Sequence, residues 1–132
     1  MFLLDTNALI IFLHDELTKA TLSKTAIDII QSEDTLYVSI ASLWEIAVKV
    51  SIGKLALRKP ISVLEDGCKK QGISIIPIKS IHLDTMIKLP MLKDHKDPFD
   101  RLILATSISE HMALISTDHK MRQTEYGADI IC

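Results

Sequence analysis

The sequence predicts an α/β fold in which helices cover both faces of a parallel β-sheet. Short apolar segments that suit strands alternate along the chain with longer segments of helical periodicity. Several strand segments are uninterrupted apolar runs, as is typical of strands buried on both faces. No repeat, low-complexity stretch or linker interrupts the 132 residues, so we expect one domain over residues 1–132.

The first half of the chain shows this alternation from its start. The run FLLD at residues 2–5 predicts a short buried strand, and ALIIFL after it predicts one or two helical turns. Residues 18–33 carry apolar side chains at helical spacing, so we expect a helix there. Residues 34–39 predict a second strand, and the segment IASLWEIAVKVSIG predicts a helix that Ser39 caps and Gly53 ends.

The second half of the chain adds three more strands. Pro60 begins a helix that ends at Gly72, and the run ISIIPI then predicts the third strand. A short helix before Pro90, a polar loop and the helical segment PFDRLILATSISEHM lead to a fourth strand, ALIST, and a fifth, ADIIC. Ligands of such sheets bind beyond the carboxyl ends of the strands, so polar residues at those ends are the candidate functional residues.

Four acidic residues are expected at or near this edge. Asp5 ends the first strand and Asp118 follows the fourth. Glu45 lies on the apolar stripe of its helix, where helix capping cannot explain a carboxylate. Asp100 falls in the first turn of the helix that starts at Pro98. If the first and fourth strands are central and parallel, these side chains face one crevice.

Each of the other acids also has a purely structural interpretation. Asp5 and Asp118 can cap the helices that follow them, and Asp97 and Asp100 around Pro98 can form no more than a helix-capping arrangement. Capping alone, however, does not predict that three or four acids converge at one edge of one sheet. We therefore favour a shared site.

Converging carboxylates need cations or protons between them. Two carboxylates about 4 Å apart repel by roughly 4 kcal/mol at an effective dielectric constant near 20. The histidines and cysteines show no metal-ligand spacing, and a site built of oxygen ligands suits Mg²⁺ or Mn²⁺. Such a site activates water and stabilises charge on a phosphoryl oxygen, which makes phosphodiester cleavage the leading chemistry.

Composition and charge limit the classes of partner. With a net charge of −2, nucleic-acid contact requires a local basic patch. Two basic runs could neutralise phosphates, and solvated helix ends explain them equally well: Lys49, Lys54, Arg58 and Lys59, and Lys93, Lys96 and Arg101. Cys68 and Cys132 make neither a metal knuckle nor a disulfide framework, which favours the cytoplasm. The apolar start lacks the basic residues of a signal peptide, and no stretch is long enough to span a bilayer.

Four segments together resemble the PIN-domain ribonucleases: LLDTNALI, SLWEIAVK, HKDPFDRLILATS and LISTDHKM. The HxDPFDR form is similar to the branch that contains VapC-type toxins of bacterial type II toxin–antitoxin pairs. The resemblance covers essentially the whole chain. It implies a three-layer α/β/α fold with a five-stranded parallel sheet, and a Mg²⁺- or Mn²⁺-dependent endoribonuclease that cleaves single-stranded or structured RNA.

The resemblance also implies the catalytic and metal-binding set: Asp5, Glu45, Asp100 and Asp118. Asp5 and Asp100 would be the most direct metal ligands, and Glu45 would ligate the metal or position water. Asp118 would act through water. Three small polar residues would support these ligands: Thr6, Asn7 and Thr117. Asp97 and His95 belong to the motif as well; we interpret Asp97 as the helix cap, and no role is assigned to His95.

The resemblance further implies a cognate antitoxin protein and a homodimer. The apolar face of residues 21–30 is expected to belong to the core, with an antitoxin groove as the alternative hypothesis. Trp44 precedes Glu45, and we expect it in the core or in a dimer interface rather than stacked on a base.

Other families also place an aspartate after a first parallel strand. Phosphatases of the haloacid-dehalogenase type need a second aspartate where this chain has Asn7, and receiver domains need one after the third strand, which here ends in Pro77 and Ile78. Both fit less well. A non-enzymatic alternative is an inactive PIN-like module that binds RNA or protein, and the presence of all four acids argues against it.

Overall fold

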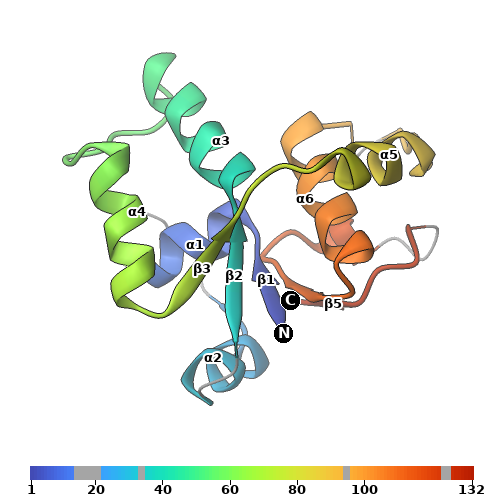
Figure 1. Ribbon diagram of the computed structural model, residues 1–132, viewed down its shortest axis with the longest axis horizontal. Helices are drawn as coiled ribbons and strands as arrows, with labels where there is room; N and C mark the ends of the chain where they lie inside the picture. The colour runs from blue at the N-terminus through green and yellow to red at the C-terminus, as the bar shows by residue number, and fades with distance from the viewer. Residues whose placement is uncertain (14–21, 33–34, 94–95, 123–125) are drawn as a thin grey trace.

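A parallel sheet of five strands forms the centre of the computed structural model, which describes residues 1–13, 22–32, 35–93, 96–122 and 126–132 (Figure 1). The strand order is β3-β2-β1-β4-β5, and every neighbouring pair is parallel. The strands are β1 (Phe2–Leu4), β2 (Leu36–Ser39), β3 (Ile73–Ile76), β4 (Ala113–Ile115) and β5 (Ile130–Ile131). The predicted α/β class and five-stranded parallel sheet are confirmed.

Helices cover both faces of this sheet. Figure 1 shows α1 and α4 on one side and α5 and α6 on the other. The helices are α1 (Thr6–Leu13), α2 (Lys24–Gln31), α3 (Ile40–Ser51), α4 (Ile61–Lys70), α5 (Ser80–Lys88) and α6 (Pro98–Ser109), with a short 3-10 helix, η1 (His119–Arg122). Among the described residues, no helix combines the length and apolar character needed to cross a membrane.

The apolar core is divided into two layers by the sheet. Successive residues of a strand point to opposite faces. Leu3 and Leu114 pack with α6 on one face, whereas Leu4 and Ile115 pack with α1 and α4 on the other. All four side chains are fully buried. This explains why the central strands read as continuous apolar runs.

Local signals set most element boundaries. Ser39 caps α3 by accepting a hydrogen bond from the backbone N–H of Ala41 at 3.0 Å, and Gly53 ends the helix with a positive φ of 76°. The helix expected over residues 18–33 begins only at Lys24. Ser23 caps it there, accepting from the backbone N–H of Ala26, and residues 18–21 lie outside the described residues.

Arg101 is a structural residue rather than part of an RNA-binding run. Its side chain is buried, and its guanidinium donates to the carbonyls of Pro90 at 2.8 Å, Leu89 at 3.1 Å and Met86 at 3.3 Å. These carbonyls lie at the end of α5, where the helix leaves acceptors unpaired and a positive charge is favourable. Both explanations of its basic run, phosphate contact and a solvated helix end, are therefore wrong for Arg101.

We predict that Arg101→Met lowers the free energy of unfolding by about 2–4 kcal/mol, because it removes the guanidinium donors of the Leu89 and Pro90 carbonyls. Urea unfolding of the purified protein measures the change. Lys96→Met is the matched control, since Lys96 is an exposed cation close by in the sequence. A loss no larger in the Arg101 variant than in the control would contradict this assignment.

Candidate functional site

The candidate site lies where the chain changes direction across the sheet. From β1 the chain continues to β2 on one side, and β4 joins the sheet on the other side of β1. Ligands of open α/β sheets bind at such a switch point, beyond the carboxyl ends of the strands. Asp5 and Ser116 directly follow β1 and β4, and the backbone N–H of Asp5 donates to the carbonyl of Ile115 at 2.9 Å. The two strand ends are thus held side by side.

Asp5 is buried and held at both oxygens. Its Oδ1 accepts from the backbone N–H of Ala8 at 2.8 Å, so it caps α1, and its Oδ2 accepts from Ser116 Oγ at 2.5 Å. Burial raises the pKa of Asp5 to about 6. The two hydrogen bonds lower the pKa, whereas the negative charges of Glu45 and Asp118 raise it further. Asp5 is therefore both a helix cap and a residue of the candidate site, because the capping hydrogen bond fixes its carboxylate in position.

Glu45 reaches the same edge from α3. It is only 4% exposed, although it is ionisable and lies in the middle of a helix. Thr6 Oγ1 donates to Glu45 Oε1 at 2.6 Å, and Lys49 Nζ lies 2.8 Å from Oε2. Thr6 Oγ1 also lies 3.1 Å from Ser42 Oγ. Burial lowers the pKa of Lys49, but the hydrogen bond to Glu45 and the negative charges nearby outweigh this effect. The net result is a raised pKa.

Asp97 and Asp100 approach from the start of α6. Asp97 is its N-cap, as predicted, and accepts from the backbone N–H of Asp100 at 3.0 Å. In the described part of the chain, Glu45, Asp97 and Asp100 form a group in which one carboxylate oxygen from each residue lies within 4.8 Å of the other two. Burial, and then the charges of Asp97, Glu45, Asp118 and Asp5, raise the pKa of Asp100 to about 7.

Asp118 lies further out. Its backbone N–H donates to Ser116 Oγ at 2.9 Å, and its carboxylate accepts from the backbone N–H of Lys120 at 2.9 Å. It is half-buried and outside the 4.8 Å group, yet its charge contributes to the raised pKa of both Asp5 and Asp100. Ser116 thus connects the two strand-end acids.

Of the four acids named from the sequence, Glu45 and Asp100 belong to the group within 4.8 Å, whereas Asp5 and Asp118 lie outside it. The charges of Asp5 and Asp118 still raise the pKa of Asp100, and the structure adds residues that sequence reasoning missed. Asp97 joins the closest group as well as capping α6. Ser116 and Ser42 were missed, although a serine two residues before Asp118 at a strand end was a usable signal.

The three supporting residues named from the sequence differ in their placement. Thr6 contacts Glu45. Asn7 is exposed and Thr117 half-buried, and within the described residues neither hydrogen-bonds to these acids. His95 lies outside the described residues.

The chemistry of this group suits a hard divalent cation. All of its ligand atoms are carboxylate oxygens, the donors that Mg²⁺ and Mn²⁺ prefer. The raised pKa values of Asp5 and Asp100 show that the ionised state is costly without a cation.

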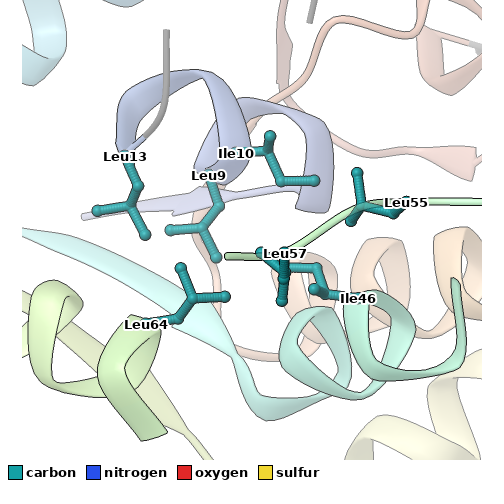
Figure 2. A pocket seen from close by; sticks show the side chains of 7 residues that line it. All are labelled: Leu9, Ile10, Leu13, Ile46, Leu55, Leu57 and Leu64. Carbon is teal, nitrogen blue, oxygen red and sulfur yellow. The ribbon is translucent and has the colours of Figure 1, made fainter. Parts of the chain in front are cut away.

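An apolar hollow elsewhere does not offer this chemistry. Figure 2 shows its lining, which consists only of hydrocarbon side chains: Leu9, Ile10, Leu13, Ile46, Leu55, Leu57 and Leu64. Such a lining offers no donor or charge to a phosphate or a metal. The acidic edge, rather than this hollow, is the candidate site.

Comparison with known proteins found one matching family model. A family model described as the PIN domain matches residues 2–125. No curated protein matches the sequence.

Solved structures share the fold over nearly the whole chain. FitAcB from Neisseria gonorrhoeae is 15% identical, with a TM-score of 0.68 over 100% of this chain and 97% of that one. VapBC2 from Rickettsia felis, bound to a promoter DNA fragment, is 14% identical, with a TM-score of 0.68. The match covers 98% of this chain and 96% of that one. A toxin–antitoxin complex from Klebsiella pneumoniae is 18% identical, with a TM-score of 0.58. The match covers 91% of this chain and 88% of that one.

We predict that the metal-free protein loses stability as pH rises from about 4 to about 7. The folded-state pKa values of Asp5 and Asp100, about 6 and about 7, exceed the ordinary 3.8, so the folded state keeps protons that the unfolded chain has released. The stabilising contribution is complete below the unfolded pKa and is lost as pH rises through the folded values. Urea unfolding in EDTA across this range measures the slope.

Asp100→Asn should flatten that slope, because the amide does not titrate, and Asp84→Asn on exposed α5 should leave it unchanged. Saturating Mg²⁺ should also flatten it, because the cation replaces the protons. A wild-type slope that neither Asp100→Asn nor Mg²⁺ changes would contradict the assigned pKa values.

Proposed function

The chain belongs to the PIN domain family, and from that premise we propose that it is a Mg²⁺- or Mn²⁺-dependent endoribonuclease that cleaves single-stranded or structured RNA. PIN domains are in general metal-dependent nucleases. The convergence of Asp5, Glu45, Asp100 and Asp118 at the switch point of the sheet carries the proposal, with Asp97 beside them.

The proposed roles follow from how each carboxylate is held. A bound divalent cation would stabilise charge on the scissile phosphate and make a water molecule more acidic. Asp5 and Asp100 are the proposed direct ligands, and Glu45, fixed by Thr6, ligates or positions the attacking water. Asp118 lies near enough for its charge to raise the pKa of Asp5, and its proposed role is to act through water.

A toxin of a toxin–antitoxin pair is the proposed biological role. The similar structure from Klebsiella pneumoniae is a toxin–antitoxin complex, and the one from Rickettsia felis is VapBC2 bound to a DNA fragment from its promoter. An apolar groove between α1 and α2 is the proposed seat of the antitoxin: Ile11, Phe12, Leu13, Leu22, Ile27, Ile30 and Gln31 line it. Neither Cys68 nor Cys132 forms a disulfide, which agrees with the cytoplasm as the proposed location.

We also propose that the chain forms a homodimer through exposed apolar residues. Trp44 was expected in the core or in a dimer interface; because it is 54% exposed, the core is excluded and the dimer interface remains. Its ring packs edge-on against Phe99, with centroids 4.8 Å apart. On α5, Leu83 and Ile87 are four residues apart, share a face and are both exposed. Light scattering of the purified chain tests the dimer, which would have twice the monomer mass.

The alternatives from the sequence now reduce to one. Membership of the PIN family sets aside the phosphatase and receiver families. An inactive PIN-like module that only binds RNA or protein remains, and an activity measurement separates it from the nuclease.

We predict that the purified chain cleaves structured RNA with Mn²⁺ and that EDTA abolishes the cleavage. Asp5→Asn should lower the rate by more than about a hundredfold, since even groups that only support a metal ligand are worth roughly 10–100-fold. Gel analysis of labelled RNA measures the rate, with Asp84→Asn as the exposed control. Cleavage that persists in EDTA, or equal rates in the Asp5 variant, would eliminate the nuclease proposal.

We predict that Ile27→Glu weakens capture of the antitoxin by about tenfold or more, because it places a charge in the apolar groove. Ile27 is 40% exposed, so the fold should tolerate the change. Co-expression with the product of an adjacent small gene, followed by affinity measurement, provides the test. Ile81→Glu on α5 is the matched control. Equal affinity in both variants would place the antitoxin elsewhere.

A further inference from the structure

Lys49 forms an ion pair with a buried carboxylate of the site. It follows Glu45 by one helical turn on α3, and its Nζ lies 2.8 Å from Glu45 Oε2 while Thr6 occupies Oε1. The side chain of Lys49 is 39% exposed, whereas that of Glu45 is 5% exposed. The ammonium group can therefore move into solvent, and the carboxylate cannot follow it.

A second pair with the same spacing shows what is different about Lys49. On α4, Lys69 Nζ lies 3.2 Å from Glu65 Oε1, but these side chains are 63% and 41% exposed. Water can replace Lys69 there, so that pair contributes little. Glu45 has no such access to water, and a buried carboxylate without a cation keeps its full desolvation cost. Lys49 is thus the counter-charge that Glu45 needs when no metal is bound.

We propose that Lys49 is a positioning residue that neutralises Glu45 in the metal-free protein, competes with the divalent cation for it, and pairs with the RNA phosphate once that cation is bound. This inference rests on the proposed nuclease function. Thr6 holds Oε1, so a cation that binds Glu45 approaches the oxygen that Lys49 contacts. A divalent cation bound at Oε2 would repel the ammonium group of Lys49, which lies at the same oxygen. Lys49 is the group that can move away, because its side chain is partly exposed. Once displaced from Glu45, the ammonium group of Lys49 is available to pair with a phosphodiester of the bound RNA.

Calorimetric titration with Mn²⁺ tests the competition in the wild type, Lys49→Met, Lys49→Arg and Lys69→Met. Lys49→Met should bind Mn²⁺ about tenfold more tightly, because a competing positive charge is gone. Lys49→Arg keeps the charge and should bind Mn²⁺ much as the wild type does, and Lys69→Met should not differ from the wild type. Lys49→Met should also melt at a lower temperature in EDTA and gain more from added Mn²⁺. If it folds only with Mn²⁺, the Mn²⁺ dependence of its melting temperature gives the affinity.

Cleavage kinetics at saturating Mn²⁺ test the transfer to phosphate. Lys49→Met should raise KM for RNA by about tenfold, and Lys49→Arg should restore most of it. Mn²⁺ affinity in Lys49→Met that equals or falls below that of the wild type would overturn the inference, as would an unchanged KM. A wild type that binds no Mn²⁺ would instead refute the proposed function, and this inference with it.

Discussion

Repulsion among carboxylates at one edge of the sheet is the constraint on which the site depends. Asp5, Glu45, Asp97, Asp100 and Asp118 come from four separate parts of the chain, and their charges act on one another. Burial of Asp5 and Glu45 increases the cost, because the ionised form loses its water. A fold that keeps these carboxylates together must hold each of them with hydrogen bonds, and a cation must be able to reach them.

The same hydrogen bonds that shape the fold hold these carboxylates. Asp5 caps α1, Asp97 caps α6 and Asp118 accepts from the first turn of η1, so helix capping and site geometry use the same atoms. Ser116 joins Asp5 to the end of β4, and Thr6 joins Glu45 to the end of β1. These contacts tie Asp5 and Glu45 to β1, β4 and α3, and strands and helices hold a site more precisely than loops do.

Local patterns were sufficient to predict the elements and the direction in which the site faces. Alternating apolar segments gave the parallel sheet, and Ser39, Gly53 and Asp97 marked helix ends that the structure confirms. Contacts between distant segments were not predictable in this way. Arg101 looked like a cation available to RNA, and only the end of α5 packed against it shows why it is buried.

Crystals of the wild-type protein soaked in Mn²⁺ offer the most direct measurement of the central claim, through anomalous diffraction at the manganese edge. The account predicts a strong anomalous peak at the carboxyl edge of the sheet, within bonding distance of Asp100 and at least one of Asp5 and Glu45. An empty edge at saturating Mn²⁺, or a peak only at some other surface, would contradict it.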